Sequence, residues 1–430
     1  MDNNAASWRD FLDHAELSDV GLRRSNNQDS LGTVICTSED AWSRRGHLFM
    51  VADGMGAHAA GELASKMAVD TILLTYYKLP DASPSDAFRK AVEEANAKIN
   101  ARGSANPDFK GMGTTTSALA VLPQGAIVAH VGDSRCYRLR GNRLEQLSAD
   151  HSLVWEMMAA SRITERDLPT YIPKNVITRS LGPNPAVQVD LEGPFPLLPG
   201  DTFLLCSDGL TGQVSDEEIG LVLQALPPNE AAQALVDLAN LRGGPDNITV
   251  VIVRVQAAPA ASRRSGPIDA SGNHAAGAGR PIHPAFWIVC GVAVLAAAAL
   301  FVSDQPLFAG VSAVVAVLTL GIALLTKAGT VEGDAADNVA LSALGRGPYR
   351  SYVCTANAAI VDRLKGLVES IRQSAVEQRW QIDWSKAEVF LERADTAAQM
   401  QDYLLAVREL CRGISFLMQE ARQQRARTAG

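Results

Sequence analysis

The sequence predicts a mixed α and β domain, followed by a pair of membrane-spanning helices and a small helical bundle. Short β-type runs alternate with helical stretches up to residue 256, two long uncharged apolar runs follow, and the last part of the chain has apolar residues at helical spacing. With 430 residues, of which 47% are hydrophobic, the chain is long enough for two or three domains.

The first domain, residues 15–256, contains runs of apolar and β-branched residues that favour strands. The clearest begin at Leu48 ("LFMVAD"), Gly125 ("GAIVAHVGDSRCYRL"), Asp201 ("DTFLLCSDG") and Asn247 ("NITVVIVRVQ"). Between such runs lie helical stretches, for example "SDAFRKAVEEANAKINAR" from Ser85. This alternation is typical of a mixed α and β domain of the size of an enzyme.

Residues 257–283 are dominated by Ala, Gly, Pro and Ser without any period, which predicts a flexible linker. Residues 284–327 contain two uncharged apolar runs, each long enough to cross a hydrocarbon core of about 30 Å as a helix. A buried helical hairpin of a soluble domain is the alternative. Basic residues flank the pair and only Asp304 charges its turn, so we expect a multi-pass protein of the cytoplasmic membrane, with both flanking parts in the cytoplasm.

Residues 333–430 are expected to form an α-helical domain. One apolar stripe at helical spacing runs from Ile360 to Ile371 and another from Tyr403 to Leu417. The simplest interpretation is a small bundle that packs on itself, and we expect it to bind a protein partner or to self-associate.

Charge and cysteine content exclude several classes of function. A formal net charge of −8 argues against a partner nucleic acid, because a general basic surface is missing. The six cysteines are scattered without a Cys-x-x-Cys pair, which favours reduced thiols over a disulfide framework or a zinc site. Cys206, beside Asp208, is interpreted as strand packing and not as a nucleophile.

Acidic residues recur where the predicted strands end. The five are Asp29 in "RRSNNQDS", Asp53 in "VADGMG", Asp133 in "HVGDSR", Asp208 in "CSDGL" and Asp246 in "GGPDNITV". Each one alone is compatible with a turn. Together they would repel one another beside apolar strands unless a cation neutralised them, and hard divalent cations such as Mg²⁺ or Mn²⁺ suit carboxylate ligands.

These segments, together with "SDVGLRRSNNQDS", "GMGTTTSALAV" and "SADHSLV", occur in an order that resembles the metal-dependent serine/threonine protein phosphatases, the PPM or type 2C family, in its bacterial form. The resemblance covers residues 15–256. It implies an α+β fold in which two antiparallel sheets form a β-sandwich flanked by helices, an α-β-β-α arrangement, with metals at one end.

The resemblance also implies roles for the acidic residues. Asp53 would bridge two metal ions, and Gly54, which has no Cβ, would offer its carbonyl oxygen to one of them. Asp208 and Asp246 would complete the shell of the other ion, and Asp29 would act near the pair, partly through bound water. The expected cofactor is therefore two ions of Mn²⁺ or Mg²⁺.

Three further positions extend this comparison. Asp133 matches the residue that, with Asp208, holds a third and weaker ion in bacterial members, and Arg24 matches the arginine that binds phosphate. The sequence departs from the pattern at Gln28, where many relatives have Glu, and at Met55, where many eukaryotic members have a histidine proposed as general acid.

The expected activity is hydrolysis of phosphoserine and phosphothreonine in cytoplasmic phosphoproteins, the products of a serine/threonine kinase, by a water activated between two metals. The expected catalytic residues are Asp53, Asp208, Asp246 and Arg24. One alternative is a pseudophosphatase scaffold that binds phosphoproteins and organises a membrane signalling complex. Another is a membrane assembly protein whose C-terminal bundle is the functional part.

Overall fold

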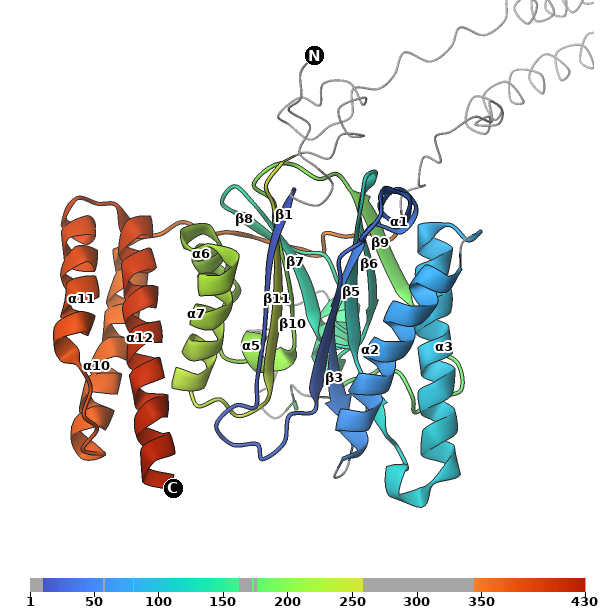
Figure 1. The fold of residues 1–430 in the computed structure, drawn as a ribbon, viewed down its shortest axis with the longest axis horizontal. Helices are drawn as coiled ribbons and strands as arrows, with labels where there is room; N and C mark the ends of the chain where they lie inside the picture. The colour runs from blue at the N-terminus through green and yellow to red at the C-terminus, as the bar shows by residue number, and fades with distance from the viewer. Residues whose placement is uncertain are drawn as a thin grey trace, which may run out of the picture. The chain divides into compact units, whose positions relative to one another are not determined.

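The computed structural model describes residues 11–56, 59–79, 81–161, 172–173, 176–257 and 344–429. Residues 1–264 and 341–430 belong to one compact unit, and residues 265–340, which form a second unit, lie outside the described residues. The described part is built from two antiparallel β-sheets packed face to face, with helices on both outer faces (Figure 1).

In both sheets every pair of neighbouring strands is antiparallel. The first sheet has the order β1-β11-β10-β7-β8-β12, and its strands are β1 (Leu12–Asp19), β7 (Arg135–Arg140), β8 (Arg143–Gln146), β10 (Thr202–Cys206), β11 (Ile248–Val255) and β12 (Arg350–Val353). The second has the order β2-β3-β5-β6-β9 with β4 beside β3, and its strands are β2 (Asp29–Val34), β3 (His47–Met55), β4 (Gly113–Thr114), β5 (Thr116–Leu122), β6 (Gly125–Val131) and β9 (Asp190–Phe195).

Helices α2 (Ala60–Lys78) and α3 (Pro84–Ala105) cover the second sheet, and α6 (Asp216–Ala225) and α7 (Pro228–Leu241) cover the first (Figure 1). Shorter helical segments connect strands, namely α1 (Glu39–Arg45), the 3-10 turn Pro107–Phe109, α4 (Leu153–Ser161) and α5 (Asp208–Thr211). Three helices follow at the C-terminal end, namely α10 (Ala358–Glu377), α11 (Trp384–Gln399) and α12 (Tyr403–Ala429).

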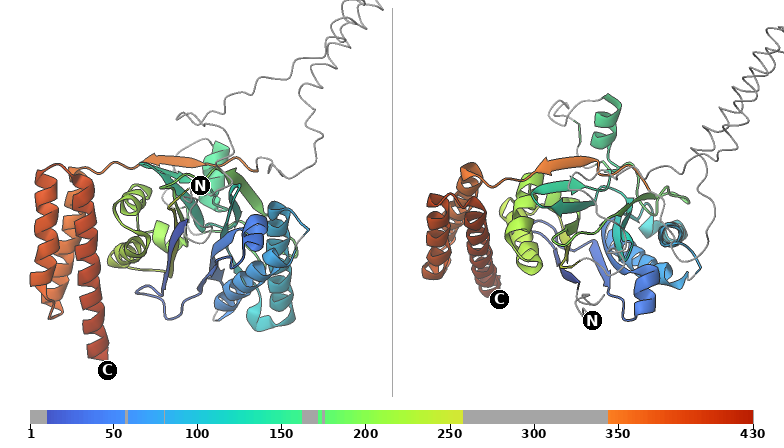
Figure 2. Two further views of the ribbon diagram at one scale, coloured as in Figure 1. Left: turned by 45° about the horizontal axis from the view of Figure 1, so that its top comes forward. Right: turned by 90° about the horizontal axis from the view of Figure 1, so that it is seen from above.

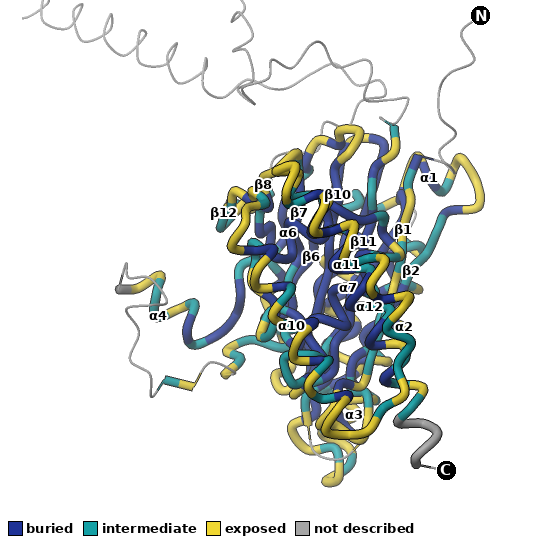
Figure 3. Tube along the Cα trace, turned by 90° about the vertical axis from the view of Figure 1, so that its left-hand side faces the viewer, coloured by how far each residue is buried: buried dark blue, intermediate teal, exposed yellow. Residues whose placement is uncertain are grey.

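The alternation of side chains along each strand produces this layering. In β3, Leu48 and Met50 pack with α2 and α3, whereas Phe49 and Val51 pack between the two sheets. Nearly every residue of β10 and β11 is buried, and these central strands are dark blue in Figure 3. Each fully buried side chain of this size contributes about 1.5–3 kcal/mol. The expected two-sheet α+β arrangement is confirmed.

Helix starts follow from capping residues. Ser83 caps α3 by accepting a hydrogen bond from the Asp86 N–H, and Pro84 occupies the first helical position, where its missing N–H costs nothing. Ser215 and Glu218 form a reciprocal capping box at the start of α6.

Residues 344–354, which we call the strap, return to the sandwich from beyond the second unit. Leu344 pairs with Gly193, and β12 extends the edge of the first sheet beside β8 (Figure 2). The buried carboxylate of Glu192, which is 2% exposed, takes its partners from the strap: Tyr349 Oη donates to Oε1 at 2.5 Å and the Gly347 N–H donates to Oε2 at 2.8 Å. The strap thus completes a buried polar site of the sandwich.

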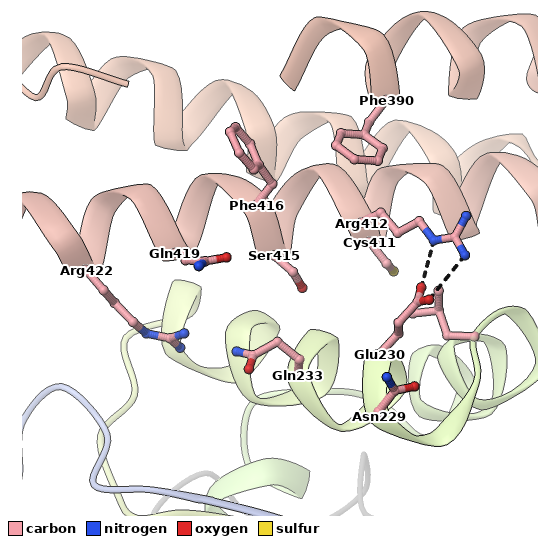
Figure 4. Close-up of a pocket in the computed structure, with 11 residues that line it drawn as sticks. Asn229, Glu230, Gln233, Phe390, Cys411, Arg412, Ser415, Phe416, Gln419 and Arg422 are labelled. Atoms are coloured by element: carbon pink, nitrogen blue, oxygen red, sulfur yellow. Dashed lines mark hydrogen bonds and ion pairs between the residues drawn. The ribbon is translucent and has the colours of Figure 1, made fainter. Parts of the chain in front are cut away.

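The three C-terminal helices pack on one another, and α12 lies against α6 and α7. Arg412 pairs with Glu230 at 2.7 Å, and Arg422 pairs with the fully buried Asp237 at 2.5 Å. A cavity of about 740 Å³ remains between α7 and α12, with Phe390 among the residues that line it (Figure 4). The apolar stripes expected in this region are buried by the packing.

The prediction of two transmembrane helices is contradicted. Among the described residues no helix is long and apolar enough to cross a membrane, because even the longest helices carry charged residues along their length. The segment expected to span the membrane, residues 284–327, lies outside the described residues. The fold class is corrected to the two-sheet domain with C-terminal helices, and the predicted location in the cytoplasmic membrane is withdrawn.

Candidate active site

Five carboxylates are placed by strand ends and turns of the sandwich. Asp29 and Asp53 lie directly opposite each other in the β2–β3 pair. Asp208 starts α5 just after β10, Asp246 lies just before β11, and Asp133 lies in the turn between β6 and β7. The charges of the other four carboxylates all act on Asp53. The structure therefore brings the acidic residues expected from the sequence into one site.

Burial and mutual repulsion raise the pKa of four of these carboxylates, namely Asp29, Asp53, Asp133 and Asp208. Burial, followed by the charges of the four neighbours, holds the pKa of Asp53 well above its usual range. Burial, with Asp208 and Asp246, raises the pKa of Asp29 to about 6. Burial, with Asp208 and Asp150, raises the pKa of Asp133 to about 7. The site is short of positive charge.

Asp29 is held by residues of the facing sheet. Its Oδ2 accepts hydrogen bonds from Ser207 Oγ at 2.8 Å and from Thr249 Oγ1 at 2.6 Å. Its Oδ1, and likewise Asp133 Oδ1, is buried without a hydrogen-bond partner among the described residues. Two oxygens that are buried, unpartnered and acidic are the strongest indication that the site receives a ligand.

The chemistry of these donors suits a divalent cation. In the described part of the chain, however, no three His, Cys, Asp or Glu side chains lie close enough together to hold a metal ion as they stand. The donors are nevertheless all oxygens, and hard cations such as Mg²⁺ and Mn²⁺ take few protein ligands and complete their shells with water. Such an ion would offset the repulsion around Asp53.

Gly54 follows Asp53 for a steric reason. A Cβ at this position would lie 2.1 Å from the carbonyl oxygen of Gly61 and 2.5 Å from that of Gln28. The Gly54 N–H also donates to Gln28 O at 3.1 Å. Only glycine therefore allows the start of α2 and the chain before β2 to pack against the end of β3.

Arg24 lies at the edge of the acidic site and pairs with Asp246, with 2.7 Å between Nη2 and Oδ2. The Arg24 side chain is about half exposed and that of Asp246 about one-third exposed, so this pair contributes only about 0–1 kcal/mol to stability. The guanidinium group is thus next to the carboxylates and open to solvent, where a phosphate group can reach it.

The residues that hold the acidic groups in place were not predicted from the sequence. Asn247 Oδ1 accepts from the Gln28 N–H at 2.8 Å, and its Nδ2 donates to Val20 O and Asn26 O, which fixes the segment that carries Arg24. Polar residues at the ends of apolar strands, such as the Asn of "PDNITV", were the available signal.

The backbone at Asp53 is held in the same way. The Asp53 N–H donates to Thr115 Oγ1 at 2.9 Å, and Thr115 Oγ1 is 2.7 Å from Ser134 Oγ.

Cys206 is fully buried, and burial raises the pKa of its thiol to about 12, so it is a packing residue and not a nucleophile.

Comparisons with known proteins agree with this geometry. The family model for "Protein phosphatase 2C" matches residues 23–238. The chain is 38% identical over 242 residues to "Protein phosphatase PhpP" of Streptococcus pneumoniae, covering 55% of this chain and 95% of that protein. It is 37% identical over 251 residues to "Serine/threonine phosphatase stp" of Listeria monocytogenes, covering 56% and 95%.

Two solved structures show the same likeness. The serine/threonine phosphatase PstP/Ppp of Mycobacterium tuberculosis matches with a TM-score of 0.50 and 36% identity, over 57% of this chain and 99% of that chain. The serine/threonine phosphatase of S. agalactiae matches with a TM-score of 0.51 and 37% identity, over 57% and 100%.

The two-sheet sandwich, with its buried carboxylates and a neighbouring arginine, is consistent with the phosphatase class that these comparisons indicate. The chain belongs to the protein phosphatase 2C family, and it is a protein-serine/threonine phosphatase.

Proposed function

We propose that the chain hydrolyses phosphoserine and phosphothreonine in phosphoproteins that a serine/threonine kinase produces, with two Mn²⁺ or Mg²⁺ ions as cofactors. The observation that carries this proposal is the convergence of five carboxylates with two buried, unpartnered oxygens, on Asp29 and Asp133. Ions of this kind supply an activated water at neutral pH and positive charge opposite the phosphate. Residues 15–256 would form the phosphatase domain.

The roles follow from where each residue lies. Asp53, at the centre of the cluster, would contact both ions, and the Gly54 carbonyl oxygen one of them; Asp208 and Asp246 would hold the second, with Asp29 nearby. Asp133, which has one oxygen free, would hold a third and weaker ion with Asp208. These carboxylates would orient the ions and lose much of their mutual repulsion in doing so.

Arg24 would bind two phosphate oxygens of the substrate through its planar guanidinium group. It would exchange its pair with Asp246, which costs little because that pair is exposed to solvent. Water then adds to phosphorus, the bond from phosphorus to the serine or threonine oxygen breaks, and the products are inorganic phosphate and the free hydroxyl. The Cys206 thiol takes no part, and direct attack by water needs no covalent phosphoenzyme.

The test is hydrolysis of a phosphothreonine peptide by the full chain with Mn²⁺, with Mg²⁺ and with a chelator. Asp53→Asn and Asp208→Asn should lose at least 100-fold in kcat, since each removes a charge that holds an ion. Arg24→Ala should mainly raise KM. The matched control is Asp70→Asn, which neutralises an exposed carboxylate on α2 and should leave turnover unchanged.

Turnover that continues in the chelator, or that survives Asp53→Asn, would contradict the two-metal proposal. A folded wild-type chain that binds Mn²⁺ and phosphopeptide without turnover would instead favour the pseudophosphatase scaffold. For the C-terminal helices we propose a role in protein–protein contact, which deletion of residues 358–430 tests through the oligomeric state of the chain.

A further inference from the structure

The ring of His151 is buried and both of its nitrogens are hydrogen-bonded. Nδ1 accepts from the Gly132 N–H at 2.9 Å, and Nε2 is 3.0 Å from Asp190 Oδ2. A ring nitrogen that accepts from an amide carries no hydrogen, so the hydrogen of the ring is on Nε2 and points to Asp190. The surroundings therefore select one tautomer of His151.

The contact to Gly132 is made twice. Besides the ring bond, the His151 N–H donates to Gly132 O at 2.7 Å. Gly132 has a φ of +117°, and a Cβ there would lie 2.5 Å from the side chain of Thr115, so this peptide has little room for another conformation. The next residue is Asp133, whose Oδ1 is buried and unpartnered. His151 thus fixes the backbone immediately before that carboxylate.

On the other side, Asp190 is bound by two groups. Oδ2 faces His151, and Oδ1 accepts from Arg179 Nη1 at 2.7 Å. Although burial opposes it, these partners lower the pKa of Asp190 to about 2, so the carboxylate is ionised at neutral pH. The Thr178 N–H also donates to the His151 carbonyl oxygen at 2.8 Å. Residues 178–179 are therefore connected through Asp190 and His151 to the turn that carries Asp133.

We propose that His151 is a positioning residue: with its ring oriented by Asp190 and Arg179, it holds the Gly132–Asp133 peptide so that the Asp133 carboxylate can take the weakest-bound divalent ion. This inference rests on the proposed function, because it assigns Asp133 to that ion. Partners that orient a ligating carboxylate affect metal affinity by about 10–100-fold when they are removed.

Two substitutions in the full chain separate the two ring nitrogens. His151→Asn retains an amide oxygen near the position of Nδ1, which can accept from Gly132, and loses the contact to Asp190. His151→Gln reaches towards Asp190 and loses the acceptor for Gly132. Mn²⁺ binding is measured by titration calorimetry, together with kcat and KM for a phosphothreonine peptide and the melting temperature. His14→Gln, at an exposed position of β1, is the control.

We expect His151→Gln to weaken the weakest Mn²⁺ site by about tenfold or more and to leave the tighter sites unchanged. We expect His151→Asn and Arg179→Ala to weaken the same site less, and His14→Gln not at all. Arg179 is about one-third exposed, so its variant should fold even if His151→Gln does not.

Wild-type affinity at every Mn²⁺ site in both His151→Gln and Arg179→Ala would overturn the inference, whatever happens to the melting temperature. If the wild-type chain binds no Mn²⁺ at all, the proposed function itself fails and this inference with it. If the wild-type chain binds Mn²⁺ and the variants bind it with the same affinity, the proposed function stands without this role for His151.

Discussion

Replacement of Tyr349 by Phe tests whether the strap is a working part of the sandwich. The change removes the hydroxyl that donates to Glu192 Oε1 at 2.5 Å and leaves one oxygen of a carboxylate that is 2% exposed without a partner. A hydrogen bond to a charged group contributes about 1.5–3 kcal/mol. We therefore expect Tyr349→Phe to lower the free energy of unfolding by about 2 kcal/mol.

The assay is urea unfolding of the full chain near pH 7.5, followed by circular dichroism and by fluorescence. Trp42 lies in the core between the sheets and is 6% exposed, so its fluorescence changes when this core unfolds. The lower stability of the variant should therefore appear as a lower urea midpoint in both signals. Combining Tyr349→Phe with Glu192→Gln should give a coupling energy of about 1 kcal/mol or more, because the two side chains are in direct contact.

Tyr403→Phe is the control, because among the described residues the Tyr403 hydroxyl has no hydrogen-bond partner; it should change stability by less than about 0.5 kcal/mol. A Tyr349→Phe chain as stable as this control, or purely additive effects of Tyr349→Phe and Glu192→Gln, would contradict a stabilising role of the Tyr349 hydroxyl.

Gly54→Ala should lower the melting temperature and the turnover together, because its Cβ would lie 2.1 Å from the Gly61 carbonyl oxygen. The control Gly366→Ala lies in open space on α10 and should raise the free energy of unfolding by about 0.5–1 kcal/mol, and calorimetry compares the two variants. Burial, and to a lesser extent the neighbouring His151, lowers the pKa of His130 to about 3. Below pH 6.5 this histidine is protonated in the unfolded chain but stays neutral in the folded chain, so the free energy of unfolding falls as the pH drops from about 6.5 towards 3. In urea unfolding, the wild-type chain should lose about 1 kcal/mol of unfolding free energy between pH 7.5 and 5.5 relative to His130→Asn. Arg422→Ala leaves the fully buried Asp237 without its ion-pair partner, so amide hydrogen exchange should become faster in α12 and change little in β10. Equal exchange in the wild-type and variant chains would show that this pair does not hold α12 against α7.

The sheets and the acidic positions could be predicted because short-range patterns encode them. Alternating residues such as Leu48 and Phe49 specify a strand with two buried faces, and the ordered motifs around Asp53 and Asp208 indicate one family. Strand-end carboxylates meet because antiparallel pairing fixes the register that sets Asp29 against Asp53.

Other features depend on contacts between distant parts of the chain, which no local pattern encodes. The pairing of β12 with β8 joins residues about two hundred positions apart, and Glu192 looks like an ordinary surface residue until the strap covers it. His151 is similar: its two partners, Gly132 and Asp190, come from different turns and strands. The apolar runs after residue 284 satisfy a length criterion for a membrane span, but the described fold provides no such helix.

The return of the strap means that the first sheet of this fold is assembled from two separate stretches of the polypeptide. The Gln256 N–H donates to Phe11 O at the end of the first stretch, and Leu344 pairs with Gly193 at the start of the second. A chain that stops at residue 257 would therefore lose both hydrogen-bond partners of the Glu192 carboxylate and also the strap residues that cover it. Conversely, a single proteolytic cut between residues 258 and 343 would leave two fragments that share one sheet, and these should remain associated without a covalent link.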